Sequence, residues 1–498
     1  MAEKFFWADA IADRIIKEKG GAKKEYVCAS GITPSGQVHI GNFREVITTD
    51  MVVRALRDKG KKVRFIYSWD DFDRFRKIPK GTDKDYEKYL GMPISDIPSP
   101  FDEKMSYSEY NEKKFEASLG KVWIEPDFIY QNEMNKKSAY ADLIKITLEN
   151  KDKIKEIIDK FRKEPLKDDW WPIMIYCDAC KKDLTKITEV DGYNVSYECE
   201  CGHSETFDIR KNGIVSIRWR IDWPLRWRFE AVDFEPGGID HSVHGGSFTT
   251  AKMISKDVFD FEPPVYQFYE WIGIKGGGAF ASSTGNALTL DEVESVYEPA
   301  VLRYLFVGTK PKSAFDISFD NDVISIYEKF DALEEKYFAG NCNPKEKRMY
   351  EMSIVKVPKK RPERTGFRGL ITAVQIGRTD DLNEFDKVRA EKVATWLDKF
   401  AGDDMKFEVQ EKVTGKYTKT EKKALVELKD ALEEKEYISD KELFDKFYEI
   451  CKVSGLSNTD FFDVAYRAII KKSKGPRLAS LILSIGQKNI IKLLSTLK

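Results

Sequence analysis

The chain has 498 residues, of which 42% are hydrophobic and 34% are charged, and its formal net charge is −1. This length predicts about three domains, and the near-neutral charge excludes the strongly basic class of chain that holds nucleic acid through its overall charge. We expect no membrane partner and no secretory signal, because no run of about 18 apolar residues occurs and no long apolar segment follows Met1.

The first seventy residues predict an alternation of helices and strands. Residues 1–20 have the apolar spacing of an amphipathic helix, and residues 26–30 form an apolar run typical of a strand. A loop rich in Gly, Pro and Ser leads into a helical segment over 43–58, and a second strand is expected over 63–69. This strand–helix–strand order predicts a parallel sheet of Rossmann type, which binds its ligands at the carboxyl ends of strands.

The middle of the chain interrupts this pattern. Lys-rich helical segments run over 105–162, and a cysteine cluster follows at 177–203. Strand-like runs return at 214–217 and 265–269, so we expect an insertion that interrupts one sheet, which then resumes. Beyond Leu302 the chain is mostly helical, and its last third has apolar residues at roughly 3.6-residue spacing.

The loop over 31–42 has the composition of a nucleotide site. Because it leads from a strand to a helix, its backbone N–H groups and the helix N-terminus can bind an anion. His39 can donate a hydrogen bond to a phosphate oxygen, and Gly41 allows a nucleotide to approach the backbone closely. An ordinary Gly/Pro/Ser turn is the alternative, but the length of the run and its position favour the nucleotide site.

A second glycine-rich segment, 237–247, holds two of the four histidines. Its glycines permit close approach of the backbone, and a carboxylate after a strand, here Asp240, can bind ribose hydroxyls. The alternative is a surface turn with an exposed pair of histidines. We expect a functional site, because the other two histidines, His39 and His203, also lie in candidate sites.

Four of the seven cysteines cluster at 177–201 and predict a zinc site. Cys177 and Cys180 form one knuckle, and Cys199 and Cys201 form a shorter second one, so that two turns supply four soft ligands for a tetrahedral shell. We favour four cysteines; His203 in place of one cysteine of the second knuckle is the alternative. A closed shell leaves no open position for catalysis, so we expect a structural Zn²⁺, in a chain that resides in the reducing cytoplasm.

The first loop resembles the His-Ile-Gly-His signature of class I aminoacyl-tRNA synthetases, here written His39-Ile40-Gly41-Asn42. Its longer form, Thr-Pro-Ser-Gly-x-x-His-Ile-Gly-Asn, is most similar to the class I lysyl-tRNA synthetases. The resemblance implies a lysine–tRNA ligase that works through lysyl-adenylate, with ATP, Mg²⁺ and structural Zn²⁺ as cofactors. It implies L-lysine and tRNA(Lys) as partners. The implied fold is an α/β Rossmann-type catalytic domain with a zinc-bearing insertion, followed by a mostly α-helical anticodon-binding domain.

The resemblance also assigns site residues. Catalytic roles are assigned to His39, Asn42, Ser283 and Thr284. ATP-binding roles are assigned to Pro34, Ser35, Gly36, His39, Gly41, Gly238, Asp240, Ser282 and Ser283. Lysine-binding roles are assigned to Gly31, Thr33, Trp223, His244 and Tyr269, and metal-binding roles to Cys177, Cys180, Cys199 and Cys201.

The segment 281–286 resembles the Lys-Met-Ser-Lys-Ser loop of the family but lacks its lysines. Aligned on the trailing Gly-Asn, Ala279 and Ser282 take the places of the two lysines, and Thr284 stands where a further lysine is common. Lysines in that loop normally neutralise the leaving pyrophosphate, and serine or threonine can donate hydrogen bonds but carries no charge. We expect Lys275 and Mg²⁺ to supply the missing positive charge.

The stretch 219–227 alternates tryptophan with charged residues, and it is expected to line the lysine pocket. A lysine ammonium binds both carboxylates and aromatic faces. Core packing is the alternative for each single aromatic residue. Asp70, Asp71 and Asp73 follow the second strand, and they either hold Mg²⁺ or order basic neighbours such as Arg74; the sequence leaves both open.

The resemblance divides the chain into five ranges. They are the first half of the catalytic domain (1–95), an acceptor-stem-contacting insertion with the zinc site (96–212), the second half of the catalytic domain (213–300), a stem-contact or linker region (301–365), and the helical anticodon-binding domain (366–498). We expect a monomer. Three alternatives remain: a class I synthetase for another amino acid such as glutamate, a catalytically inactive tRNA-binding relative, and a small-molecule adenylyltransferase.

Overall fold

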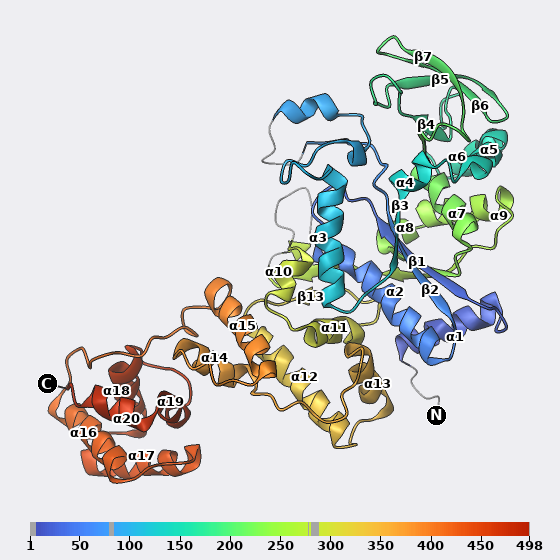
Figure 1. Cartoon of the computed structure of the whole chain (residues 1–498). Coiled ribbons are helices and arrows are strands. Elements are labelled where there is room, and N and C mark those ends of the chain that lie inside the picture. The colour runs from blue at the N-terminus through green and yellow to red at the C-terminus, as the bar shows by residue number, and fades with distance from the viewer. Residues whose placement is uncertain (1–5, 79–83, 277, 280–287, 498) are drawn as a thin grey trace. The chain divides into compact units, whose positions relative to one another are not determined.

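A computed structural model describes residues 6–78, 84–276, 278–279 and 288–497, which form two compact units (Figure 1). The first unit comprises residues 1–294, 299–317 and 342–357, and the second comprises 295–298, 318–341 and 358–498. Within the described ranges, none of the helices has the length and apolar character needed to cross a membrane.

A five-stranded parallel sheet forms the centre of the first unit, with the strand order β10-β9-β1-β2-β3. Its strands are β1 (Tyr26–Ile32), β2 (Val63–Trp69), β3 (Asp127–Tyr130), β9 (Phe234–Gly238) and β10 (Val265–Tyr269). The predicted interruption of the sheet is confirmed, because β9 and β10 join β1 after a long insertion. The order reverses between β1 and β9, and such a switch point places a ligand crevice at the carboxyl ends of these two strands.

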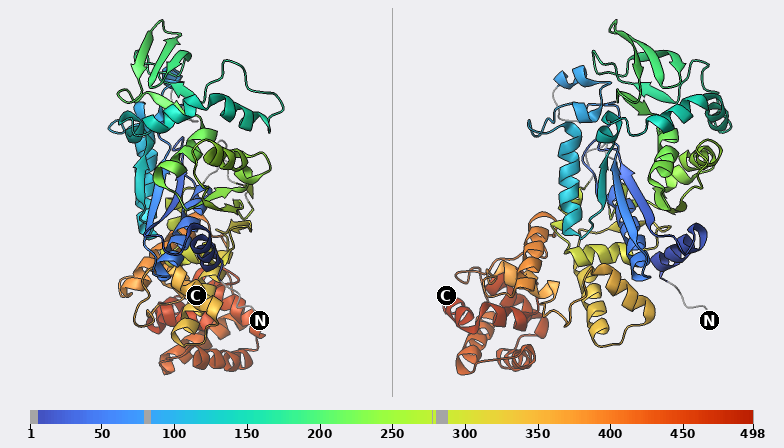
Figure 2. Two further views of the ribbon diagram at one scale, coloured as in Figure 1. Left: turned by 90° about the vertical axis from the view of Figure 1, so that its right-hand side faces the viewer. Right: turned by 45° about the vertical axis from the view of Figure 1, so that its right-hand side comes forward.

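The two faces of the sheet are covered by different helices, so its strands are apolar on both sides. Val27, Ala29 and Ile66 pack against Trp223 and Trp227 of α7 (Trp219–Glu230), with α9 (Ser247–Asp257) beside them. The opposite face is covered by α2 (Ile40–Asp58) and α3 (Tyr107–Lys121), and α1 (Trp7–Lys19) packs on α2. Figures 1 and 2 show α3 and the α7–α9 pair on opposite sides of the sheet.

The insertion carries its own small sheets and helices. A two-stranded sheet pairs β4 (Ile173–Ile175) with β8 (Val215–Ile217), and a three-stranded sheet joins β5 (Thr185–Asp191), β6 (Asn194–Cys199) and β7 (Ser204–Asp208). The helices here are α4 (Gln131–Lys136), α5 (Ala141–Glu149) and α6 (Lys151–Asp159), and two 3₁₀ turns, η1 (Lys84–Tyr89) and η2 (Ile94–Asp96), precede α3.

Two sequence expectations are corrected here. The strand predicted at 214–217 does not belong to the resumed parallel sheet, because β8 pairs antiparallel with β4. The segment 105–162 is not wholly helical, because β3 is the edge strand of the central sheet. Its four residues are too few to show a period-2 pattern between two helices.

The remaining elements of the first unit complete it around α2 and the sheet. They are α8 (Ile239–Ser242), β11 (Ile272–Ile274), β12 (Gly278–Ala279), α10 (Leu290–Glu294), α11 (Pro299–Gly308), β13 (Phe315–Ile317) and α13 (Pro344–Ser353). Among them α11 packs on α2, and α13 packs on α11. The strands β12, β11 and β13 form a separate three-stranded sheet.

Helices joined by loops make up the described residues of the second unit, as the apolar spacing predicts. Its helices are α12 (Asp322–Phe338), α14 (Phe367–Gln375), α15 (Glu384–Lys399), α16 (Lys419–Glu434), α17 (Asp440–Ser454), α18 (Asn458–Ile470), α19 (Leu478–Ile485) and α20 (Gln487–Leu494). One apolar core joins α16 through α20. The predicted α/β fold with a mostly helical C-terminal region is confirmed, whereas the five-part division stays a prediction.

A buried arginine joins three stretches of the second unit. The Arg389 side chain is fully buried, and its guanidinium contacts Glu298 at 2.9 Å and Asp331 at 2.8 Å. Two carboxylates around one guanidinium balance the cost of burying its charge only while all three groups remain together.

Candidate active site

The first loop lies at the carboxyl end of β1, where the strand order reverses, and it leads directly into α2. The helix begins at Ile40, three residues before the predicted start, so Gly41 and Asn42 lie in its first turn. His39 is the N-cap residue, and its backbone N–H donates to Asn42 Oδ1 at 3.3 Å. The structure therefore brings His39, Gly41 and Asn42 together at a helix N-terminus, where an anion is stabilised.

Helix α3 holds the loop from the side. The Tyr107 hydroxyl donates to the Ser35 carbonyl at 3.0 Å, and Asn111 Nδ2 donates to the Pro34 carbonyl at 3.4 Å. Asn111 is 2% exposed, so its contact lies away from water. These bonds fix the path of the backbone over Pro34, Ser35 and Gly36.

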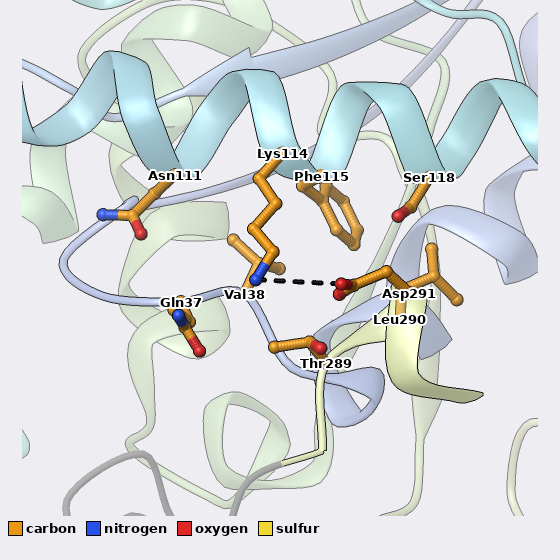
Figure 3. A pocket seen from close by; sticks show the side chains of 9 residues that line it. All are labelled: Gln37, Val38, Asn111, Lys114, Phe115, Ser118, Thr289, Leu290 and Asp291. Atoms are coloured by element: carbon orange, nitrogen blue, oxygen red, sulfur yellow. Dashed lines mark ion pairs between the residues drawn. The ribbon is translucent and has the colours of Figure 1, made fainter. Parts of the chain in front are cut away.

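A small cavity lies between α3 and the loop (Figure 3). Figure 3 shows Lys114 reaching from α3 toward Asp291, and its Nζ lies 3.7 Å from Asp291 Oδ2. Asp291 belongs to α10, which follows the segment that resembles the Lys-Met-Ser-Lys-Ser loop. The predicted site residues Ser282, Ser283 and Thr284 lie outside the described residues.

The described residues just after that segment contact the first loop. The Ile40 N–H donates to the Leu288 carbonyl at 2.9 Å, and His39 forms an antiparallel β-bridge with Thr289. Two segments about 250 residues apart in the sequence are thereby joined at His39.

On the expectation from the sequence that the first loop binds ATP, replacing Tyr107 by phenylalanine should raise the KM for ATP about fivefold, because one hydrogen bond contributes about 1 kcal/mol net. The measurement is steady-state pyrophosphate exchange at varied ATP. Tyr110→Phe on the same helix is the matched control, since its ring packs on Phe101. An unchanged KM for ATP in Tyr107→Phe would contradict the role given to α3.

A buried glutamate, which the sequence analysis did not select, links two predicted site residues. Gly31 N–H donates to Glu45 Oε1 at 3.0 Å, and the Tyr269 hydroxyl donates to Glu45 Oε2 at 2.7 Å. Burial raises the pKa of Glu45 to about 8. The available signal was its position: Glu45 follows Gly41 by four residues, so both lie on one face of α2.

Gly31 has a structural reason to be glycine. A Cβ atom there would lie 2.5 Å from the carbonyl oxygen of Ser68 on β2. The close approach of β1 and β2 therefore excludes a side chain, independently of any ligand.

The three carboxylates after β2 have separate protein partners. Asp70 accepts a bond from Arg226, Asp71 accepts from the backbone and side chain of Asn132 at 2.7 and 3.0 Å, and Asp73 accepts from Thr33 Oγ1 at 2.9 Å. Burial raises the pKa of Asp71 and of Asp73 to about 6, and the nearby charge of Asp70 adds to the shift at Asp73.

Of these three carboxylates Asp70 contacts a basic group, and both roles named from the sequence stay predictions. The basic partner is Arg226, whereas Arg74 pairs with Asp183 at 3.1 Å. Among the described residues, one group of three or more His, Cys, Asp or Glu side chains is close enough together to hold a metal ion, and it consists of the four cysteines.

A cavity lies between the carboxyl halves of β1 and β2 and helix α7. Trp219 and Trp223 stack at its edge, with ring centroids 5.2 Å apart and planes 16° apart. The ionisable residues of its lining are Asp70, Tyr140, Arg226, Glu230 and Glu235, and Gly31 and Trp227 also line it.

Acidic groups outnumber the basic group around this cavity. Arg226 contacts Asp70 at 2.5 Å and Asp222 at 2.8 Å, so its charge is already balanced by two carboxylates. Glu235 accepts from Trp227 Nε1 at 2.5 Å, and burial raises its pKa to about 7. An aromatic wall beside excess carboxylate favours a cationic ligand group.

Known proteins are similar to this chain along nearly its whole length. The family model for tRNA synthetases class I (K) matches residues 5–356. The chain belongs to this family. A lysine–tRNA ligase of Borreliella burgdorferi is 42% identical over 515 aligned residues, and one of Pyrococcus horikoshii is 39% identical over 516. A lysine–tRNA ligase of Treponema pallidum is 39% identical over 518, and all three alignments cover 98% of both chains.

In this class I synthetase the histidines of the second glycine-rich segment lie in different surroundings. His241 lies 5.8 Å from the Trp223 ring and 6.0 Å from the Trp219 ring. His244, which carries the lysine-binding prediction, is exposed and meets Phe161 edge-on at 5.6 Å. The contact with the tryptophans is made by His241, and the role of His244 stays a prediction.

Gly238 is the last residue of β9 in the synthetase, and Asp240 follows it in α8. Gly238 is the register partner of Tyr269, and a Cβ on Gly238 would lie 2.4 Å from Asp240 Oδ1. The Asp240 carboxylate thus lies directly over Gly238, in space that a side chain at position 238 would compete for. It is half exposed, so a ligand can reach it.

The four cysteines of the synthetase come together as the spacing predicts. Their Sγ atoms all lie within 4.8 Å of one another, with Cys177 and Cys201 at 3.7 Å and Cys180 and Cys199 at 3.6 Å. A tetrahedral shell with Zn–S bonds of about 2.3 Å has sulfur–sulfur distances of about 3.8 Å. The donor set therefore fits zinc, and the His203 imidazole instead lies 3.5 Å from Glu205.

Proposed function

We propose that the chain activates L-lysine with ATP and transfers the lysyl group to tRNA(Lys). The observation that carries the proposal is the position of the aromatic and acidic cavity, which has Gly31 in its lining and so opens beside the first loop. Class I membership and relatives named lysine–tRNA ligase support it.

In the first step an oxygen of the lysine carboxylate forms a bond to the α-phosphorus of ATP. The bond from that phosphorus to the bridging oxygen breaks, and pyrophosphate leaves with the electron pair. His39 and the first turn of α2 would donate hydrogen bonds to the phosphates as negative charge develops. Asp240 would accept from the ribose hydroxyls, and Thr33 would lie beside the reacting carboxylate.

In the second step a terminal hydroxyl oxygen of the tRNA forms a bond to the lysyl carbonyl carbon and its proton is released to solvent. The bond from that carbon to the phosphate oxygen breaks, and AMP leaves with the electron pair. No protein nucleophile is required, so the contribution of the enzyme is positioning and charge stabilisation. The positive charge for pyrophosphate release would come from Mg²⁺ and Lys275, because Ala279 and Ser282 stand at the two lysine positions of the family pattern and Thr284 where a further lysine is common.

The choice of lysine over glutamate would follow from the charges of the cavity. A lysine ammonium would enter between tryptophan faces and the Glu235 carboxylate, since Glu230 is already paired with Arg64 at 2.6 Å, whereas a glutamate side chain would meet like charge. Trp223 would contact the aliphatic part of the substrate, since its face lies in the cavity wall.

The four cysteines would hold one structural Zn²⁺ that joins the two knuckles of the insertion. Zinc would supply folding energy there and take no part in the reaction, because four sulfur ligands fill its coordination shell. The helical second unit would bind the anticodon stem and loop. Cytoplasmic location and the monomeric state also stay predictions.

The deciding experiment is ATP–pyrophosphate exchange on the purified protein with each amino acid in turn. We expect exchange with lysine and none with glutamate. Exchange with glutamate would show that the chain is a class I synthetase with a different amino-acid specificity. Binding of tRNA without exchange for any amino acid would support an inactive relative, a possibility raised by the missing loop lysines.

A further inference from the structure

Glu45 is a buried carboxylate that the two-step reaction above does not use. It lies in the second turn of α2 and receives one hydrogen bond on each oxygen, from Gly31 N–H and from the Tyr269 hydroxyl. These partners stand at the carboxyl ends of β1 and β10, on either side of β9. Glu45 therefore fixes two strand ends that border the substrate crevice.

The hydrogen-bond direction at Tyr269 determines what its oxygen can do next. A phenolic hydroxyl that donates its proton to a carboxylate keeps its lone pairs to accept from a third group. The negative charge of the carboxylate polarises that hydroxyl and strengthens its acceptor character. A cationic N–H donor is the partner that gains most from such an oxygen.

Lysine carries two ammonium groups, and the cavity beside α7 accounts for one of them. Tyr269 and Glu45 are not among the residues that line that cavity, whereas Tyr269 lies next to Gly238, at the strand ends near the first loop. An ammonium held between Trp223 and Glu235 would be the ε-ammonium. The α-ammonium, which stays close to the reacting carboxylate, would lie at the strand ends.

We propose that Glu45 orients the Tyr269 hydroxyl as an acceptor for the α-ammonium of lysine, so that Glu45 is a positioning residue for amino-acid binding. This inference rests on the proposed lysine specificity and adds a residue to the same site. The Glu45–Tyr269 pair supplies the charge that an α-ammonium needs once it has left water.

The groups around Glu45 set the pKa of its carboxyl group. The groups that face it are Tyr67 on β2, Asp70 beyond β2, Glu235 on β9, and Tyr266 and Tyr269 on β10. Burial is the largest cause of the raised pKa, and the charges of Glu235 and Asp70 raise it further, whereas the bonds from Gly31 and Tyr269 lower it. The carboxylate form gains in population as the pH rises through about 8.

The test compares Glu45→Gln, Tyr269→Phe and the double variant in lysine-dependent pyrophosphate exchange. A glutamine can donate from Nε2 to the tyrosine oxygen, which turns the hydroxyl proton toward the substrate. We expect Glu45→Gln to raise the KM for lysine about 10- to 30-fold, because one charge-assisted hydrogen bond to the substrate is lost. The KM for ATP should change less than twofold. Tyr269→Phe should have little further effect in the Glu45→Gln background.

Tyr130→Phe is the matched control, because the Tyr130 hydroxyl donates to Glu116 at the same 2.7 Å distance outside the site. Its KM for lysine should equal that of the wild type. Thermal unfolding of each variant reports whether the fold persists. If Glu45→Gln does not fold, Tyr269→Phe tests the proposal by itself, and its KM for lysine should rise.

Two further readouts separate substrate contact from a general loss of order. Inhibition by 6-aminohexanoate, which lacks the α-ammonium, should have the same Ki in wild type and Glu45→Gln. The wild-type kcat/KM for lysine should rise more steeply between pH 7 and 8 than that of Glu45→Gln, in which only the carboxyl groups with lower pKa values, such as Glu235 at about 7, still titrate.

A wild-type protein without lysine exchange would overturn the proposed function. Wild-type exchange combined with an unchanged lysine KM in Glu45→Gln would overturn only this inference. A Ki for 6-aminohexanoate that rises as much as the lysine KM would also overturn it, because the effect would then not depend on the α-ammonium.

Discussion

Replacing His39 by alanine is expected to lower kcat for pyrophosphate exchange by 10²- to 10³-fold, with the KM for lysine changed less than about threefold. The imidazole lies where charge develops on the phosphates, so its loss affects the transition state more than amino-acid binding. Burial lowers the pKa of His39 below its usual 6.5, so the ring is neutral at pH 7 to 8. It therefore acts as a hydrogen-bond donor and not as a fixed cation, and its contribution should be constant across that pH range.

His39→Asn is the informative companion variant. His39 is the N-cap of α2, and an alanine at an N-cap costs about 1 kcal/mol of stability, whereas asparagine caps well. We expect His39→Asn to restore the unfolding temperature but not kcat. Recovery of kcat in this variant would mean that His39 acts only through the helix start, which would remove its assigned role toward ATP.

Replacing Cys177 by alanine is expected to abolish zinc binding and to unfold the three-stranded sheet β5–β7. Metal binding supplies about 10–16 kcal/mol of folding free energy in small zinc modules, and Cys177 is one of four ligands. The measurements are metal content per chain and amide hydrogen exchange. We expect one zinc per wild-type chain, none in the variant, and loss of protection confined mainly to the insertion.

Two controls decide the ligand set. His203→Ala should keep its zinc, because His203 lies against Glu205 and the four thiols already complete a tetrahedron. Cys342→Ala, at a cysteine outside the cluster, should also keep it. Loss of zinc in His203→Ala, together with its retention in Cys201→Ala, would show that the histidine is the fourth ligand.

Much of the site was predictable because its signals are local. The first loop combines a strand, a glycine-rich turn and a helix start within a few residues, and each of these is visible in the sequence. The zinc cluster is equally local, since two short knuckles determine which side chains meet. Positions such as Gly31 also follow from strand geometry once β1 and β2 are paired.

The unpredicted features depend on contacts between distant segments. Glu45 looks like an ordinary helical residue until β10 brings Tyr269 against it, and Arg226 meets Asp70 only through the packing of α7 on the sheet. Strand β3 has four residues, and its assignment follows from pairing with β2 and not from its own pattern. A single sequence carries no direct record of such pairings.

The interleaving of the two units has a consequence for synthesis on the ribosome. Helix α13, within 342–357, belongs to the first unit, although residues 318–341 before it belong to the second. The first unit therefore cannot complete its structure until about residue 357 has left the exit tunnel. Glu298 and Asp331 stay without their partner for longer, until Arg389 has also emerged, so the nascent chain exposes an acidic pair that a fragment starting at residue 366 would not contain.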